Sequence, residues 1–171
     1  MRERPGLVTF RGTPATLVGE VPEVGAPAPP FTALRADLSA FSLADVGGRA
    51  VVINSVPSLD TPVCQTQTRR FNREAAELGP GVKVLVVSTD LPFAMHRFCA
   101  TEGIANLETL SDHLECSFGL AYGLLMREFR LLARSVLVID RHGILRYQEL
   151  VPKSGQEPDY ELALAQARAC A

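Results

Sequence analysis

Short apolar runs recur along the chain, and most of them are bounded by glycine, proline or small polar residues. The run at 49–54 predicts a buried strand, and the run at 83–89 predicts a parallel strand buried on both faces. A further pair of runs, 135–140 and 144–150, flanks Arg141-His142-Gly143, which is the pattern of a β-hairpin. The pattern therefore predicts a sheet that contains both parallel and antiparallel strands.

Helical spacing separates these strands. Phe71, Ala75 and Leu78 recur at the period of a helix that starts near Pro62, and Gly79 follows them as a stop signal. Other helices are predicted over 91–102, from Ser111-Asp112 to about Tyr122 and over 158–169, with a short strand at 107–110.

The N-terminal third lacks helical patterns. Two apolar runs around Arg11-Gly12-Thr13-Pro14 predict a hairpin, although a frayed terminus has the same composition. The remaining segments are an extended connector at 22–30, a second hairpin from 31–34 and 41–43, and a loop from Gly123 to Leu132.

At 171 residues the chain is long enough for one domain with a sizeable core. We expect a single α/β domain over 1–171, in which 1–20 forms a hairpin extension. Strand–helix–strand units require right-handed crossovers, so helices should cover both faces of the mixed sheet.

Charge and hydropathy narrow the function classes. The formal net charge is −2 and no basic run is present, which argues against nucleic-acid binding. No apolar stretch approaches the length of a transmembrane helix, and no signal-peptide pattern follows the charged start. We therefore expect a soluble, cytoplasmic protein with no membrane partner.

Cys64 is the first candidate for chemistry. It falls in the first turn of the helix predicted after Asp60, Thr61 and Pro62, where free backbone N–H groups and the helix dipole favour a thiolate. Arg69 follows on the same helix and adds positive charge. The alternative is a small buried apolar residue, which is the common fate of a free cysteine.

Four cysteines are too few for a disulfide framework in a chain of this length, and none forms a Cys-x-x-Cys pair. Cys116 is expected in the core, and the thiol of Cys170, next to the terminus, is expected to be exposed and open to intermolecular disulfides. The histidines, His96, His113 and His142, have no partner at ligand spacing, so we expect neither a metal nor another cofactor.

The spacing Pro57-x-x-x-Thr61-x-x-Cys64, within PSLDTPVC, resembles the active-site pattern of the peroxiredoxins, most closely their thiol peroxidase branch. The segments LPFAMHRFC and LLARSVLVID are similar to the same branch. The resemblance implies a thioredoxin-like fold preceded by an N-terminal hairpin.

The resemblance also implies roles for individual residues. Cys64 would be the peroxidatic nucleophile, Thr61 would position the peroxide, and Pro57 would shape and shield the loop. Spacing alone does not separate that role of Thr61 from a plain helix cap. Arg134 would fix thiolate and peroxide, although a lone arginine at a strand start is usually a solvated surface residue.

In the same branch an intrachain disulfide links cysteines at the places of Cys64 and Cys99, which makes Cys99 the expected resolving thiol. Cys99 could otherwise be a buried apolar residue beside Phe98. Because two cysteines in separate helices seldom satisfy disulfide geometry in both redox states, a local rearrangement of either helix is expected.

The expected activity is reduction of hydrogen peroxide and organic hydroperoxides, with thioredoxin as reductant and a homodimer as the assembly. Two alternatives use the same fold: a peroxide-sensing thiol switch without sustained turnover, and a thioredoxin-like binding module without redox chemistry.

Overall fold

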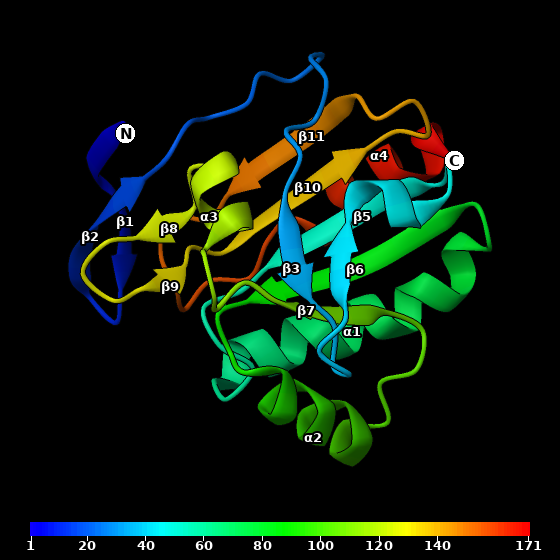
Figure 1. Cartoon of the computed structure of the whole chain (residues 1–171), viewed down its shortest axis with the longest axis horizontal. Helices are drawn as coiled ribbons and strands as arrows, with labels where there is room; N and C mark the ends of the chain where they lie inside the picture. Colours follow the sequence, from blue (N-terminus) through cyan, green and yellow to red (C-terminus); the bar gives the residue numbers. More distant parts are fainter.

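A computed structural model describes residues 1–171, which form eleven strands, four α-helices and one 3₁₀ helix (Figure 1). The strands are β1 (Glu3–Phe10), β2 (Thr13–Val18), β3 (Thr32–Leu34), β4 (Ala40–Ser42), β5 (Ala50–Ser55), β6 (Val82–Ser88), β7 (Glu108–Ser111), β8 (Leu125–Met126), β9 (Leu131–Leu132), β10 (Ser135–Ile139) and β11 (Leu145–Leu150). The helices are α1 (Pro62–Leu78), α2 (Pro92–Glu102), α3 (Ser117–Ala121), α4 (Tyr160–Cys170) and the 3₁₀ helix η1 (Leu43–Val46).

A seven-stranded mixed sheet forms the body of the molecule, in the order β11-β10-β5-β6-β7-β3-β4. Strands β5, β6 and β7 are parallel to one another, and β10 runs antiparallel to β5 before it turns into the β10–β11 hairpin. The mixed sheet predicted from the apolar runs is confirmed: the strand predicted at 83–89 is its central strand, and the strand predicted at 49–54 lies next to it.

The central strands are buried on both faces of the sheet, because a separate cluster of apolar side chains covers each face. Val52, Val84 and Val138 share one cluster with Phe71 of α1 and Leu164 of α4. The residues next to them in each strand, among them Ile53, Leu85 and Leu137, belong to a larger cluster on the opposite face. Successive residues of a strand point to opposite faces of the sheet. A strand that is covered on both faces therefore needs an apolar residue at every position, which gives a continuous apolar run.

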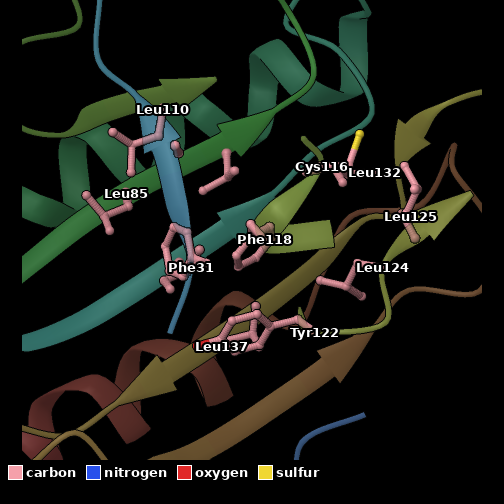
Figure 2. Close-up of a cluster of buried hydrophobic side chains, with 14 of the residues drawn as sticks. Phe31, Leu85, Leu110, Cys116, Phe118, Tyr122, Leu124, Leu125, Leu132 and Leu137 are labelled. Atoms are coloured by element: carbon pink, nitrogen blue, oxygen red, sulfur yellow. The ribbon is translucent and has the colours of Figure 1, made fainter. Parts of the chain in front are cut away.

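The larger cluster is aromatic at its centre. Phe31, Phe118 and Tyr122 pack edge to face or stacked, with ring centroids 4.8–6.0 Å apart. Figure 2 shows these rings together with aliphatic side chains from both the large sheet and the segment around α3. Helices α1 and α4 therefore cover one face, while α3 and a second sheet cover the other (Figure 1).

The second sheet has four strands in the order β1-β2-β8-β9, and its first two strands are the predicted N-terminal hairpin. The prediction of a loop over 123–132 was wrong, because β8 and β9 lie there. Strand β8 pairs with β2, so that Leu17 lies opposite Met126. Strands β8 and β9 are only two residues long, and β8 pairs with a strand more than a hundred residues away in the sequence. The local sequence pattern therefore does not indicate these strands.

The helix predicted from Ser111-Asp112 is shorter than expected. The chain turns after Asp112, Cys116 adopts a left-handed backbone conformation (φ 52°), and α3 begins only at Ser117. The Asp112 carboxylate nevertheless accepts hydrogen bonds from the backbone N–H groups of Phe118 and Gly119. Asp112 therefore satisfies the start of the helix from across a turn rather than from the position just before it.

The small sheet lies at the end of the large sheet from which β10 starts (Figure 1). Val8, Ala15 and Leu17 of its first two strands belong to the same core cluster as the central strands. Beyond the core, backbone hydrogen bonds join Thr9 to the segment that follows β11, from Thr9 N to Pro152 O and from Ser154 N to Thr9 O. These bonds bring the N-terminal hairpin beside the residues described next.

Candidate functional site

The candidate site is built where β5 ends and α1 begins. Thr61 is the N-cap residue with extended backbone angles (φ −114°, ψ 143°), and Pro62 is the first helical residue. Proline fits this position because the N–H it lacks would have no partner in the helix. Cys64 is therefore the third residue of α1, in its first turn, as the sequence predicted.

The loop ahead of the helix is held by Asp90, which follows β6. Its Oδ1 accepts a hydrogen bond from Ser58 Oγ (2.8 Å), and its Oδ2 accepts from Leu59 N (2.7 Å) and Ser88 Oγ (2.7 Å). Bonds to an ionised carboxylate are stronger than neutral ones. Asp90 thus fixes the loop two residues before Thr61, and it also lies two residues before the start of α2.

Two polar groups meet on the Cys64 sulfur. Thr61 Oγ1 donates to Sγ at 2.8 Å, and Arg134 Nη2 donates to the same atom at 3.3 Å. The cysteine is 0% exposed, and apolar side chains that include Val56 and Met95 form the rest of its surroundings. A negatively charged sulfur surrounded by apolar side chains is stable only if hydrogen bonds or a positive charge compensate for lost hydration. The Thr61 hydroxyl and the Arg134 guanidinium provide both.

Thr61 lies at the start of the helix but does not act as a plain helix cap. It occupies the N-cap position, but its side chain makes no capping hydrogen bond. Its hydroxyl contacts Cys64 Sγ and the Ser58 carbonyl oxygen (3.0 Å) instead. The side chain therefore serves the sulfur and the loop rather than the free N–H groups of the helix.

Arg134 is 2% exposed, unlike most arginines at strand starts. Besides the sulfur, its guanidinium donates to Gln67 Oε1 through Nη1 (2.5 Å) and to the Ser154 carbonyl oxygen through Nη2 (2.8 Å). Its Nε is buried without a hydrogen-bond partner. One donor of a buried cation is therefore left for another oxygen atom.

Gln67 links this cation to the sheet. Its Nε2 donates to Asn54 Oδ1 (3.4 Å), and Asn54 Nδ2 donates to the Leu85 carbonyl oxygen (3.4 Å). Gln67 and Asn54 are fully buried. Buried polar groups are stable when their hydrogen-bonding atoms have partners. The series of hydrogen bonds from Leu85 through Asn54 and Gln67 therefore orients the Arg134 guanidinium.

Sequence reasoning missed Gln67, Asn54, Asp90 and Ser154. Gln67 carries a signal in its spacing, because residues three apart share a helix face and it follows Cys64 by three. Asn54 could be noticed as a polar residue within an apolar strand. Ser154 contributes a backbone carbonyl, which no side-chain pattern reports.

A cavity of about 140 Å³ adjoins these groups. Pro57, Thr61 and Arg134 line it together, which places three of the predicted residues at one opening. The other lining residues are Phe10, Arg11, Pro62, Val63, Ser154 and Gly155. The N-terminal hairpin therefore forms part of the wall, which the sequence did not indicate.

Cys99 lies in α2, half-buried, and packs against the same apolar cluster that contains Cys64. Burial raises the pKa of its thiol, while Thr109 Oγ1 lies 3.7 Å from its Sγ and opposes that shift. Both cysteines are free thiols. The structure brings Cys64, Thr61, Pro57 and Arg134 together, and it places Cys99 at the edge of their apolar surroundings.

The remaining cysteines are separate from this site. Cys116 is buried in the large core cluster, as predicted, with Arg130 Nη2 3.5 Å from its sulfur. Cys170 is half-buried against the second cluster, so the expectation of an exposed thiol was wrong. It packs there because the final helix runs on to Cys170, one turn beyond the buried Ala167.

Other charged groups near α1 are paired. Arg69, expected to add positive potential, forms an ion pair with Glu102 of α2 (2.6 Å). Nowhere in the chain do three histidine, cysteine, aspartate or glutamate side chains gather as a metal-binding group. None of the helices combines the length and apolar character needed to cross a membrane.

The sequence is similar to those of known proteins over most of its length. A family model described as Redoxin matches residues 23–164. The thiol peroxidase of Bacillus subtilis is 50% identical over 162 residues, which cover 95% of this chain and 96% of that protein. The thiol peroxidase of Halalkalibacterium halodurans is 51% identical over 162 residues, with 95% and 97% covered.

Solved structures agree with the fold. A peroxiredoxin-like protein from Aquifex aeolicus superposes with a TM-score of 0.89 at 37% identity, covering 98% of this chain and 99% of that one. A thiol peroxidase from Chromobacterium violaceum, at 19% identity, has a TM-score of 0.82 over 91% of each chain and supports the fold alone. The predicted thioredoxin-like α/β fold is confirmed. The chain belongs to the redoxin family, in its thiol peroxidase branch, and is a thiol-dependent peroxidase.

Proposed function

We propose that Cys64 is the peroxidatic nucleophile of this enzyme, with Thr61 and Arg134 as the groups that hold the peroxide. The observation that carries the proposal is the meeting of the Thr61 hydroxyl and the Arg134 guanidinium on the Cys64 sulfur, at 2.8 and 3.3 Å. The cation stabilises negative charge on sulfur, and the surrounding apolar side chains exclude water that would weaken the attraction.

In the first step the Cys64 thiolate attacks the terminal oxygen of the hydroperoxide. A sulfur–oxygen bond forms and the oxygen–oxygen bond breaks. The departing alkoxide or hydroxide takes the proton that the attacked oxygen carried and leaves as an alcohol or water. Sulfur is oxidised by two electrons to a sulfenate, and the peroxide is reduced by two. The reacting atoms must be in line, so positioning contributes much of the rate.

The surroundings supply the donors for this step. The Thr61 hydroxyl and the unpartnered Nε of Arg134 can turn to the two peroxide oxygens, where negative charge develops. Arginine suits this task because it stays charged and presents its donors in a fixed plane. Pro57 lines the cavity and limits access to the sulfur.

Cys99 is proposed as the resolving thiol. Once the sulfenate has taken up a proton, the Cys99 sulfur attacks Cys64, the sulfur–oxygen bond breaks, and oxygen leaves as water with the Cys99 proton. The shared apolar cluster supports this pairing because it joins α2 to the first turn of α1. We expect one of these helices to rearrange locally, as disulfide formation tolerates little error in geometry.

An external dithiol then reduces the disulfide and is itself oxidised. The resemblance to thiol peroxidases supports thioredoxin as this dithiol, a homodimer as the assembly and the cytoplasm as the compartment. Hydrogen peroxide and organic hydroperoxides are the proposed substrates.

The experiment is peroxide turnover coupled to NADPH through thioredoxin and its reductase, with wild type, Cys64→Ser and Cys99→Ser. Wild type should consume many equivalents of peroxide. C64S should be inactive, because serine is no nucleophile at neutral pH without a base. C99S should complete at most one equivalent, since its sulfenate lacks a resolving thiol.

Cys170→Ser serves as the matched control, because that cysteine lies outside the site, and its turnover should equal wild type. Digestion of oxidised protein without reductant should give a linked Cys64–Cys99 peptide. Consumption of a single equivalent by wild type would instead indicate a peroxide sensor, and the absence of the linked peptide would reject Cys99 as resolver.

A further inference from the structure

The hairpin between β1 and β2 brings a second arginine to the cavity beside Cys64. Phe10 and Thr13 pair across the turn, so Arg11 and Gly12 form a two-residue loop with φ of 51° and 83°. Two residues with positive φ are the pattern of a type I′ turn, which favours asparagine or glycine at its first central position. Arginine there is strained, and strain that persists points to a functional reason.

The hairpin tip is tied to the candidate site through Ser154. Arg11 N donates to Ser154 Oγ (3.1 Å), and the Ser154 carbonyl oxygen accepts from Arg134 Nη2 (2.8 Å). Thr9, two residues before Arg11, is hydrogen-bonded to the same segment on both of its backbone groups. The backbone at Arg11 is therefore fixed relative to the guanidinium that contacts the sulfur.

The guanidinium of Arg11 has no partner within the chain. It takes part in none of the ion pairs, and its only hydrogen bond is made by its backbone N–H. Arg11 and Arg134 are the only charged residues among those that line the cavity. The cavity thus carries two positive charges and no carboxylate, while the charge of Arg134 is directed at Cys64.

The remaining wall of the cavity is largely apolar. Phe10 packs against Phe129 with ring centroids 5.0 Å apart, and Pro57, Pro62 and Val63 line the same space. A hydrogen peroxide molecule needs no such wall, whereas the carbon chain of an organic hydroperoxide would contact it. A wall of this kind that ends in an unpaired cation at the exposed hairpin tip is complementary to an apolar chain with an anionic group.

We propose that Arg11 is a specificity-determining residue that favours organic hydroperoxides bearing a carboxylate, with Phe10 contacting their carbon chain. The proposal deepens the peroxidase function above and rests on it. Lys153 and Asp60, which adjoin lining residues in the sequence, are exposed and of opposite charge, so they add no net charge at the rim.

The test uses a matched pair of substrates, the hydroperoxide of linoleic acid and that of its methyl ester, below the concentration at which micelles form. The measured quantity is the ratio of kcat/KM for the acid to that for the ester. Arg11→Asn removes the charge and places the preferred residue in the turn, so this variant should fold. Its acid-to-ester ratio should fall about three- to fivefold, which is the upper part of the range for an exposed ion pair.

In Arg11→Lys the acid-to-ester ratio of kcat/KM should stay close to the wild-type value, because lysine retains the positive charge. Arg97→Asn is the matched control, since Arg97 is an exposed arginine of α2 without an ion pair, and its ratio should equal wild type. Added salt should lower the wild-type ratio and leave that of Arg11→Asn unchanged, because salt screens exposed charges.

Three outcomes would overturn the proposal. An acid-to-ester ratio unchanged in Arg11→Asn rejects it while leaving the peroxidase function intact. An unchanged ratio together with a raised KM for thioredoxin would assign Arg11 to a protein partner instead. Failure of wild type to turn over hydrogen peroxide and both organic hydroperoxides would overturn the proposed function itself, and this inference with it.

Discussion

The geometry of the Cys64 site depends on the hydrogen bonds of one buried guanidinium, that of Arg134. Arg134 directs its two terminal nitrogens to Gln67, Ser154 and the Cys64 sulfur, and a buried guanidinium that lost one of these acceptors would turn toward another. Removing one partner of a buried charged hydrogen bond costs more than the bond itself contributes, because the other partner stays desolvated. Gln67 therefore matters to the site although it does not contact the sulfur.

Gln67→Met is the residue-scale prediction. Methionine has nearly the same shape, but it offers no strong acceptor to Arg134 Nη1, so the guanidinium loses its orientation. We expect kcat/KM for hydrogen peroxide to fall about tenfold, equivalent to about 1.4 kcal/mol of transition-state stabilisation. Competition against a reference peroxidase would measure the rate of the first step alone.

Gln65→Met is the matched control, because Gln65 lies in the same helical turn and its side chain makes no hydrogen bond to Arg134. Its rate should stay within about twofold of wild type. Equal rates for Gln67→Met and Gln65→Met would show that Gln67 does not position the cation.

At the scale of elements, short polar links set where helices begin. The loop before α1 and the start of α2 are joined through Asp90, whose carboxylate holds Leu59 N and Ser58 Oγ. The start of α3 depends in the same way on Asp112. In both places one carboxylate accepts hydrogen bonds from several groups near the start of a helix that have no partner within a helix or strand.

Asp90→Asn tests the link between the two helices. The amide can accept on only one atom, so one of the bonds to the loop is lost and Thr61 is held less firmly. We expect kcat/KM for hydrogen peroxide to fall about three- to tenfold and the free energy of unfolding to fall by about 1–2 kcal/mol.

The identical change at Asp37 provides a comparison. That carboxylate accepts from Ser39 N and Ser39 Oγ in the exposed β3–β4 turn, outside the cavity beside Cys64. Asp37→Asn should leave the peroxide rate at the wild-type value. A peroxide rate equally unaffected in Asp90→Asn would contradict the link.

Asp112 gives a prediction about pH. Burial raises its pKa from 3.8 to about 6, and the backbone N–H groups of Gly119 and Phe118 oppose that shift. Between these values the folded protein keeps a proton that the unfolded chain has lost. The free energy of unfolding contributed by this group is therefore fully present below pH 3.8 and is lost as pH rises to about 6.

Urea unfolding at several pH values would measure this loss. Wild type should lose about 1–3 kcal/mol between about pH 4 and pH 6 relative to Asp112→Asn, which cannot titrate. Other carboxyl groups contribute equally to both proteins, so only the difference in slope is informative. Parallel stability curves would mean that the pKa of Asp112 is not raised.

At the scale of the whole molecule, the N-terminal hairpin is part of the core. Leu17 of β2 is 0% exposed and belongs to one cluster with Ile53, Leu85 and Leu137 of the large sheet. Figure 2 shows that the same cluster includes Leu125, from the strand that pairs with β2. The small sheet thus shares its packing with the sheet that carries the site.

Leu17→Ala should therefore destabilise the entire protein. The cost should be about 2–4 kcal/mol, the usual range for a leucine truncated in a packed core. Leu7→Ala, on the neighbouring strand at 45% exposure, should change stability by less than about 0.5 kcal/mol.

Urea unfolding followed by far-ultraviolet and near-ultraviolet circular dichroism measures both changes. Since we propose one domain over 1–171, the two signals should change together in a single transition for every variant. Two separated transitions, with Leu17→Ala affecting only one, would indicate that the hairpin extension folds as a unit of its own.

The sequence by itself determined what depends on neighbours along the chain. Apolar runs and their bounding residues located the central strands, and the order Thr61, Pro62, Cys64 placed the cysteine in the first turn of a helix. These features arise from backbone geometry and from periodic burial, both of which are local. Arg134 and Cys99 were named only through the resemblance of their segments to thiol peroxidases.

Only the tertiary structure decided which distant groups meet. Cys64 and Arg134 are 70 residues apart, and their contact depends on β5 and β10 lying side by side in the large sheet. The pairing of β2 with β8, the backbone carbonyl of Ser154 and the place of Arg11 at the cavity have the same origin. Each depends on packing between elements far apart in the chain, and that packing follows from the whole core rather than from any one segment.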